Sequence, residues 1–259
     1  NVPYIVCVRN TDLNLFAKYR PDLKWQASKI LKNARSVVFL NMPYVEQARG
    51  LFPFLCETAF KDKCYVIPNG LDDFWLERNR PKGERFEISK ASPLQILFVG
   101  DDTKNKNFEM VISAISEIGK SLPVELNVVG RRIDEPDRFP SHVKIHQLGK
   151  VGREELAKQY DKSALLLVPS IHETFGLVYL EALINRVMVI HSKGQGVSGY
   201  FGSKHGAFEV DPNNLHDICA QIETAISATI NWAETEKMLM SEFSWESVSQ
   251  KIINAYSKF

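Results

Sequence analysis

The amino-acid sequence predicts an α/β protein built on parallel sheets, and three observations support this fold class. Six short apolar runs are mostly continuous rather than alternating, which is typical of strands buried on both faces. Segments of helical periodicity lie between these runs, as expected where helices cover a parallel sheet. The 259 residues, 44% hydrophobic and 24% charged, have the composition of an ordinary globular protein.

The individual elements follow from the same patterns. A closing helix is expected in the tail, because Ser244 is a candidate N-cap and apolar residues from Trp245 to Tyr256 recur at helical spacing, including Val248 and Ile252. We expect strands at 4–8, 36–40, 94–100, 124–130, 164–168 and 187–190. We expect helices near 23–35, 43–52, 107–121, 152–162, 176–185 and 213–230.

The chain divides where apolar periodicity lapses, between Pro68 and Pro93. The part before the break has too few strands for a comfortable independent sheet, and the chain lacks an initiator Met, so we expect an incomplete, truncated first domain. The expected divisions are a partial first domain at 1–67, a linker at 68–93, a second domain at 94–240 and a closing helix at 241–259 that returns towards the first domain.

Composition excludes several kinds of protein. There are 32 Lys and Arg residues against 31 Asp and Glu, so the net charge is +1. A dedicated nucleic-acid-binding domain usually carries a broad positive surface, so nucleic acid is not an expected partner. The four cysteines form no C-x-x-C pair and no zinc-like cluster with histidine, so no structural metal is expected. No apolar run has the roughly 18 residues needed to span a bilayer, and there is no signal-peptide pattern. We therefore expect a cytoplasmic protein.

The most informative stretch, 169–183, follows an expected strand and opens a helix near Gly176, which is where parallel sheets bind ligands. Unpaired N–H groups at Gly176 and Leu177, with the helix dipole behind them, would attract an anion such as a diphosphate. Glu181 lies among apolar helix residues, where a carboxylate needs a partner, and the hydroxyls of a sugar would supply one. Glu173, eight positions earlier, can reach the same site.

Glu173 and Glu181, within ETFGLVYLEAL, resemble the signature of the retaining GT-B glycosyltransferases of family four. Further segments match that family in order and spacing. The resemblance implies a GT-B fold, with two Rossmann-like, doubly wound parallel-sheet domains, the first of them incomplete. The matching segments are VIPNGLD (66–72), ILFVG (96–100) followed by Lys106, LNVVG (126–130), HQLGKV (146–151), the glycine-rich run at 193–202 and the FSW-initiated tail.

The resemblance also implies roles for particular residues. Glu173 would lie at the reacting face of the donor sugar, Glu181 would hold the nucleotide ribose, and Lys106 would neutralise the diphosphate leaving group. Glu173 and Lys106 are thus the catalytic candidates. The donor would be a UDP- or GDP-linked sugar, with no cofactor and no metal required. The donor-binding candidates are Gly100, Lys104, Asn105, Arg131, Val151, Thr174, Phe175, Gly176, Leu177 and Glu181.

The implied activity is transfer of a hexose, with retention of configuration, to a hydroxyl of a lipid-linked or saccharide acceptor in cell-surface polysaccharide or glycolipid synthesis. Two departures from the family pattern leave an alternative open. Asp101 stands where relatives carry Arg, with Lys104 as a candidate substitute, and Arg9–Asp12 stand where relatives often carry His. The alternatives are an inactive nucleotide-sugar-binding partner of a larger synthase and a sugar-nucleotide epimerase or phosphorylase of related architecture.

The front of the chain is basic, with ten Lys and Arg against five Asp and Glu in residues 1–66. This pattern suits peripheral docking on the anionic inner face of a membrane, and the alternative is an ordinary surface helix with scattered lysines and a Trp packed on a neighbour. On the helix expected near 23–35, one side carries Leu23, Ala27, Ile30, Leu31 and Ala34, and the other carries Lys24, Trp25, Lys29, Lys32 and Arg35.

Overall fold

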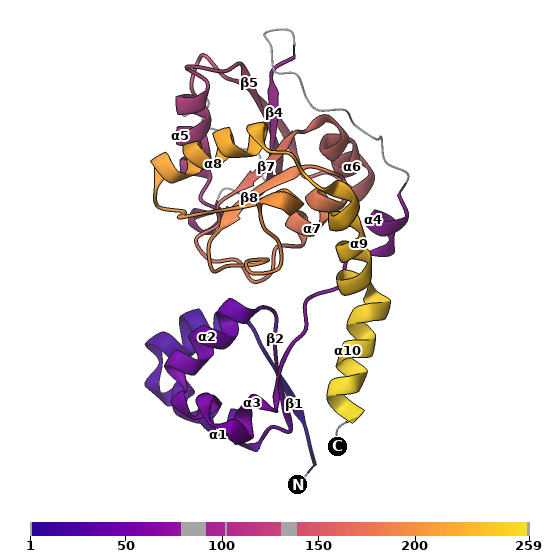
Figure 1. Ribbon diagram of the computed structural model, residues 1–259. Helices are drawn as coiled ribbons and strands as arrows, with labels where there is room; N and C mark the ends of the chain where they lie inside the picture. Colours follow the sequence, from indigo (N-terminus) through magenta and orange to yellow (C-terminus); the bar gives the residue numbers. More distant parts are fainter. Residues whose placement is uncertain (1, 79–91, 102, 131–138, 258–259) are drawn as a thin grey trace.

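The computed structural model describes residues 2–78, 92–101, 103–130 and 139–257, and it contains two lobes, each built on a parallel sheet (Figure 1). The sheet of the first lobe has the order β1–β2–β3, and that of the second has the order β6–β5–β4–β7–β8–β9. Two parallel sheets flanked by helices confirm the predicted α/β class. The first sheet, with three strands among the described residues, is the smaller one, as expected.

In the first lobe, β2 is buried along its whole length, and its neighbours pair with it in parallel. Asn41 caps the helix that follows, because its side chain accepts a hydrogen bond from the backbone N–H of Tyr44. The elements are β1 (Ile5–Val8), the π-helix η1 (Asp12–Ala17), α1 (Pro21–Asn33), β2 (Ser36–Phe39), α2 (Met42–Leu51), η2 (Pro53–Cys56), α3 (Thr58–Lys61) and β3 (Cys64–Val66).

In the second lobe the strand order reverses between two neighbouring strands at the centre of the sheet, β4 and β7. The loops that follow two parallel neighbours leave from the same edge, so residues far apart in the sequence meet there. The elements are β4 (Leu94–Gly100), η3 (Lys104–Lys106), α5 (Phe108–Ile118), β5 (Val124–Gly130), β6 (Lys144–Gly149), α6 (Arg153–Lys162), β7 (Leu165–Val168), α7 (Leu177–Ile184), β8 (Met188–Ser192), η5 (Ser203–His205), β9 (Ala207–Val210), α8 (Leu215–Ser227) and α9 (Trp232–Phe243).

The chain crosses between the lobes at two adjacent places. After β3 it leads into α4 (Asp73–Glu77), and after α9 it returns as α10 (Trp245–Ser257), which runs along the first lobe (Figure 1). The two crossings are joined where the N–H of Leu71 donates to the carbonyl of Phe243 at 2.7 Å. Further along α10, Ser36 Oγ donates to the carbonyl of Ala255 at 3.1 Å. The end of α10 therefore lies against the first lobe.

Arg78, just after α4, binds the second lobe. Its guanidinium forms a bidentate ion pair with Asp161, and Nη1 also donates to Asn185 Oδ1 at 2.5 Å. Asp161 belongs to α6 and Asn185 follows α7, so this single side chain holds the segment after α4 against two helices of the second lobe. A planar guanidinium suits a carboxylate held in this way, because it offers two parallel N–H groups.

The bounds of β4 and β5 match the prediction, and the other predicted strands begin and end within two residues of the observed ones. Three strands were missed. β3 has only three residues, β6 contains Lys144, His146 and Gln147 and lies at one edge of its sheet, and β9 contains Glu209 at the opposite edge. A search for continuous apolar runs finds the central strands and the apolar edge strand β1, but it overlooks these three edge strands, whose apolar runs are short or interrupted by polar residues.

The helix predictions need two corrections. The helix expected near 23–35 is α1, which begins at Pro21, and Ile30, expected on its buried side, is 48% exposed; Leu31 is its buried residue. The tail contains α9 as well as α10, because Asn231 caps a further helix that the sequence reading did not separate. Ser244 does accept from the N–H of Ser247, as an N-cap should. Among the described residues, no helix combines the length and the apolar character that crossing a bilayer requires.

Candidate active site

The candidate site is built on the loop from Pro169 to Gly176, which joins β7 to α7. Hydrogen bonds from its surroundings fix this loop: Ser192 Oγ donates to the carbonyl of Ser170 at 2.6 Å, and the hydroxyl of Tyr179 donates to that of Val168 at 2.8 Å. Ser170, Ser192 and Tyr179 are all buried. The loop therefore has a defined shape at the carboxyl end of the central strands.

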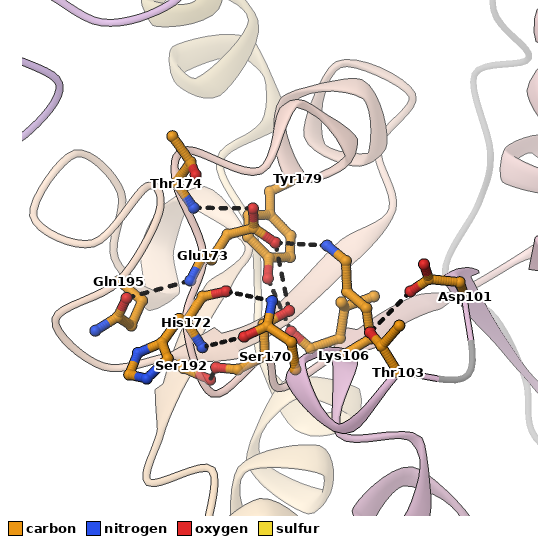
Figure 2. A network of polar contacts seen from close by, with 12 residues as sticks. Asp101, Thr103, Lys106, Ser170, His172, Glu173, Thr174, Tyr179, Ser192 and Gln195 are labelled. Carbon is orange, nitrogen blue, oxygen red and sulfur yellow. Dashed lines mark hydrogen bonds and ion pairs between the residues drawn. The ribbon is translucent and has the colours of Figure 1, made fainter. Parts of the chain in front are cut away.

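The carboxylate of Glu173 lies at the centre of this loop and accepts three hydrogen bonds (Figure 2). Its Oε2 accepts from Lys106 Nζ at 2.8 Å and from Ser170 Oγ at 3.3 Å, while its Oε1 accepts from the N–H of Thr174 at 3.1 Å. The Glu173 side chain is 12% exposed and that of Lys106 23%. The structure thus brings together the two predicted catalytic residues, which come from the loops after β7 and β4.

Asn105, predicted to bind the donor, uses its side chain to brace the loop. Its Oδ1 accepts from the N–H of His172 at 3.0 Å, and its Nδ2 donates to the carbonyl of His172 at 2.7 Å. The backbone carbonyl of Asn105 also accepts from the N–H of Ile171. These contacts join the turn that carries Lys106 to the loop that carries Glu173. They therefore help to hold the Lys106 amine next to the Glu173 carboxylate.

The loop ends at Gly176, whose φ of +75° lies in the left-handed region. A Cβ at this position would lie 2.3 Å from the ring of Tyr179, so only glycine fits. The N–H of Tyr179 donates to the carbonyl of Gly176 at 2.9 Å, so the N–H groups of Leu177 and Val178, which precede it, are the ones left for an anion, with the positive end of the helix dipole behind them. Leu177, the first residue of α7, is 41% exposed. This end of α7 can therefore accept an anion.

Glu181 lies further along α7, beside α6 rather than beside Lys106. The hydroxyl of Tyr160 donates to its Oε2 at 3.1 Å. Burial raises the pKa of Glu181 to about 7; the hydrogen bond from Tyr160 opposes this shift and the negative charge of Asp72 adds to it. Ionisation of this buried carboxylate is costly in the free protein. Hydrogen-bond donors would stabilise its ionised form, and the vicinal hydroxyls of a ribose would supply such donors.

The remaining predicted donor-binding residues occupy different surroundings. Lys104 and Thr174 are exposed and Val151 is half-buried in the loop before α6. Phe175 is 1% exposed and packs in an aromatic cluster with Tyr200 and Phe243, so its side chain belongs to the core and only its backbone remains for a ligand. Arg131 lies outside the described residues.

The glycine at the end of β4 and its neighbour Asp101 lie beside the turn that carries Lys106. A Cβ at Gly130 would lie 1.7 Å from the carbonyl oxygen of Gly100, so the ends of β4 and β5 approach each other closely. Asp101 is exposed, and its carboxylate accepts from the hydroxyl of Thr103 at 2.9 Å (Figure 2). The Asp101 carboxylate is therefore bonded to a side chain of its own turn, whereas Lys106 pairs with Glu173.

The sequence reading missed four polar residues of the site. Tyr160 contacts Glu181, and Gln195 accepts from the N–H of Glu173 at 3.2 Å (Figure 2). From the first lobe, Asn10 Nδ2 and the hydroxyl of Tyr44 both donate to the backbone carbonyl of Glu173. Two of these four had a sequence signal: Asn10 falls within Arg9–Asp12, the segment where the family often carries His, and Gln195 falls within the glycine-rich run at 193–202.

Comparison with known proteins identifies the family of this chain. The family described as glycosyl transferases group 1 matches residues 81–239, more than half of the chain. An uncharacterised glycosyltransferase of Methanocaldococcus jannaschii is 26% identical over 98% of this chain and 69% of its own length. O-antigen chain mannosyltransferase B of Escherichia coli is 33% identical over 43% of this chain and 30% of its own length. The chain thus corresponds to part of longer relatives, as predicted.

A solved structure of HepE from Anabaena, in complex with UDP and glucose, superposes with a TM-score of 0.70 and 18% identity, covering 99% of this chain and 72% of its own. At this identity the likeness establishes the shared fold, here the two-lobed GT-B fold expected from the sequence. Together with the extent of the family match, it leads to one conclusion: the chain belongs to the group 1 glycosyl transferases, a family of GT-B enzymes that use nucleotide-sugar donors.

Proposed function

We propose that this protein transfers a hexose from a UDP- or GDP-linked sugar to a hydroxyl acceptor with retention of configuration. The observation that carries the proposal is the pairing of Lys106 with Glu173 at 2.8 Å, beside the amino end of α7. A cation and a helix terminus together suit a diphosphate, and a carboxylate next to them suits the positive charge that develops on a departing sugar.

In this proposal Lys106 and the first N–H groups of α7 stabilise the diphosphate, which gains negative charge as the bond to the sugar breaks. Because these groups are already in place, little reorganisation is needed as the reaction proceeds. Glu173 stabilises the positive charge of the oxocarbenium-like sugar, which is the partner of the diphosphate in the breaking bond. Lys106 then has two anionic partners, Glu173 in the free protein and the diphosphate when the donor is bound.

The O-antigen mannosyltransferase among the relatives favours a saccharide or lipid-linked acceptor in polysaccharide or glycolipid synthesis. The inactive-partner alternative rests on Asp101, which stands where relatives carry a cation. The match to a transferase family leaves the epimerase and phosphorylase alternative without support of its own. Nucleotide binding with no transfer to any acceptor, in a chain that includes the rest of the first lobe, would favour the inactive partner.

The nucleotide site can be tested by calorimetric titration with UDP-glucose and GDP-mannose at pH 6 and pH 8. We expect saturable binding to one of them, with an affinity about tenfold higher at pH 8. Glu181, with a pKa of about 7, is mostly protonated at pH 6, and only its ionised form accepts from both ribose hydroxyls. These sugar conjugates lack the terminal phosphate that titrates in UDP itself, so the protein is the source of the pH dependence.

Glu181→Gln is the matched control, because it keeps the size of the side chain and removes its titration. The variant should bind more weakly than the wild type at pH 8 and with equal affinity at both pH values. No binding of either nucleotide sugar by the folded chain would refute the proposed function. An affinity that rises towards pH 6 would leave the function standing and remove the assignment of Glu181 to the ribose.

We further propose that the first lobe docks on an anionic membrane surface. Trp25 on α1 is 61% exposed, and Lys29 Nζ lies 3.7 Å from the centre of its ring. Nearby, Tyr19 is 64% and Ile30 48% exposed, so aromatic and apolar groups stand among basic ones. An apolar body ringed by lysines suits the headgroup region of a membrane. Of the other predicted basic residues, Lys32 is exposed and lies over the ring of Phe54, and Arg35 follows α1, whereas Lys24 is half-buried over the buried ring of Phe52 and is not part of the exposed basic side.

Sedimentation with vesicles tests this docking. The wild-type chain should bind vesicles containing about 30% phosphatidylglycerol, and Trp25→Ala together with Lys29→Ala should reduce the bound fraction several-fold, because each basic residue contributes about 1 kcal/mol near such a surface. The control, Lys120→Ala and Lys158→Ala, removes two exposed lysines from the second lobe and should leave binding unchanged. Equal retention on neutral vesicles, or none on either kind, would refute the docking.

A further inference from the structure

The peptide group between Glu173 and Thr174 connects the two lobes to the Glu173 carboxylate. On one side, the N–H of Thr174 donates to Glu173 Oε1 at 3.1 Å (Figure 2). On the other side, the carbonyl of Glu173 accepts from the first lobe, from the hydroxyl of Tyr44 and from Asn10 Nδ2, the latter at 3.2 Å. The N–H of Gly196, in the second lobe, also donates to this carbonyl at 3.3 Å.

These first-lobe donors are well defined. Tyr44 is fully buried and Asn10 is 6% exposed, and Asn10 Nδ2 lies 2.8 Å from the hydroxyl of Tyr44. Burial raises the pKa of Tyr44 to about 12, so its hydroxyl keeps its proton at neutral pH and remains a donor. Gln195 completes the cluster, because its Oε1 accepts both from the N–H of Glu173 and from Asn10, each at 3.2 Å.

A peptide group is planar, and in the trans form its carbonyl and its N–H point in opposite directions. Donors that fix the carbonyl of Glu173 therefore also fix the direction of the Thr174 N–H, which holds Oε1. Hydrogen bonds to a carbonyl also polarise its peptide group and strengthen the N–H on the other side as a donor. Two contacts from the first lobe thus act on the carboxylate without touching it.

We propose that Tyr44 and Asn10 are positioning residues that set the Glu173 carboxylate through the 173–174 peptide group when the lobes are in contact. The inference rests on the proposed function, because the position of the Glu173 carboxylate matters for catalysis only if the protein is the transferase proposed above. In that case the activity of Glu173 depends on contact with the first lobe. Oε2 is held within the second lobe, by Lys106 and Ser170, whereas the peptide group that holds Oε1 is fixed in part from the first.

The structure offers a matched control for this idea. Tyr200, in the second lobe, also makes a hydroxyl hydrogen bond across the lobes, to the carbonyl of Leu40 at 2.7 Å. Tyr200→Phe and Tyr44→Phe each remove one interlobe hydroxyl and leave the ring in place, but only Tyr44 contacts the 173–174 peptide group. An effect of lobe contact in general would appear in both variants, whereas positioning of Glu173 would appear in Tyr44→Phe alone.

The first readout needs no substrate. In chain labelled with ¹⁵N-threonine, hydrogen exchange of the Thr174 amide should be about fivefold faster in Tyr44→Phe than in the wild type, as expected for one lost hydrogen bond. Tyr200→Phe should leave that rate unchanged, and thermal unfolding checks that both variants fold. Equal exchange rates of the Thr174 amide in both variants, whether raised or unchanged, would overturn the inference.

The second readout is turnover with the nucleotide sugar that the titration selects. Tyr44→Phe should lower kcat about fivefold with KM for the donor unchanged, because the proposed nucleotide contacts lie in the second lobe. Tyr200→Phe should retain the wild-type kcat, and Tyr44→Phe should have no further effect in a Glu173→Gln background. A wild-type chain that binds no nucleotide sugar would refute the proposed function, while the exchange rate of the Thr174 amide would still decide whether Tyr44 sets this peptide group.

Discussion

Replacing Glu173 with glutamine is expected to lower the turnover of the transferase by about 10²–10³-fold while the protein remains folded. Glutamine keeps the size of the side chain and the ability to accept from Lys106 and Ser170, but it carries no charge to stabilise the sugar as the bond to the diphosphate breaks. Because the loss is confined to the transition state, affinity for the nucleotide should stay within about threefold of the wild type.

The measurement is the initial rate of nucleotide release at saturating donor, together with calorimetric binding of UDP. Glu154→Gln, on the exposed first turn of α6, is the control and should behave as the wild type. The affinity of Glu173→Gln for UDP gives a second test, of whether Lys106 pairs with Glu173 in the free protein. In this variant Lys106 loses its charged partner and becomes available to a diphosphate. A wild-type rate in Glu173→Gln would remove Glu173 from the chemistry.

The site illustrates what a sequence can and cannot show. Glu173 and Lys106 are 67 positions apart, yet both follow central strands, and parallel neighbours β4 and β7 bring their loops to one edge. The sequence analysis placed Lys106 at this site through the family resemblance, and the observed strand order gives the physical reason why the two loops meet. The need of Glu181 for a partner was also predictable, because a carboxylate on an apolar helix is costly to bury.

The partners themselves were not predictable. Tyr160 contacts Glu181 because α6 packs beside α7, and an isolated tyrosine on a helix gives no sign of its neighbour. Asn10 and Tyr44 lie 163 and 129 positions from Glu173 and belong to another lobe. Their contact depends on how two separate sheets meet, whereas periodicity describes only which face of an element is buried.

The same reasoning explains the errors in the fold. Continuous apolar runs locate β4, β5, β7 and β8, which have neighbours on both sides. The edge strand β6 contains polar residues, of which Lys144 and His146 contact Glu125 on the neighbouring strand. Its sequence therefore has no continuous apolar run, which is the pattern of a strand buried on both faces.

Removal of the Lys106 amine is expected to affect both binding and turnover. Lys106→Ala should weaken UDP about tenfold and lower kcat about 10²-fold, since the diphosphate loses its cation as its negative charge increases. Calorimetry and initial rates measure the two effects. Lys104→Ala tests the neighbouring candidate: Lys104 is exposed and does not share the Glu173 contact, so a smaller loss is expected. Lys120→Ala, at the distant end of α5, serves as the unaffected control.

The double variant Lys106→Ala with Glu173→Gln decides whether the two side chains act as one unit. Lys106→Ala leaves Glu173 without a counter-charge, and Glu173→Gln leaves Lys106 without one. Both side chains are partly buried, Lys106 being 23% exposed and Glu173 12% exposed. If they work on the same bond-breaking step, the loss of kcat in the double variant will be much smaller than the product of the two single losses. Losses that multiply would show instead that the 2.8 Å ion pair is structural and that Lys106 stabilises the diphosphate independently of Glu173.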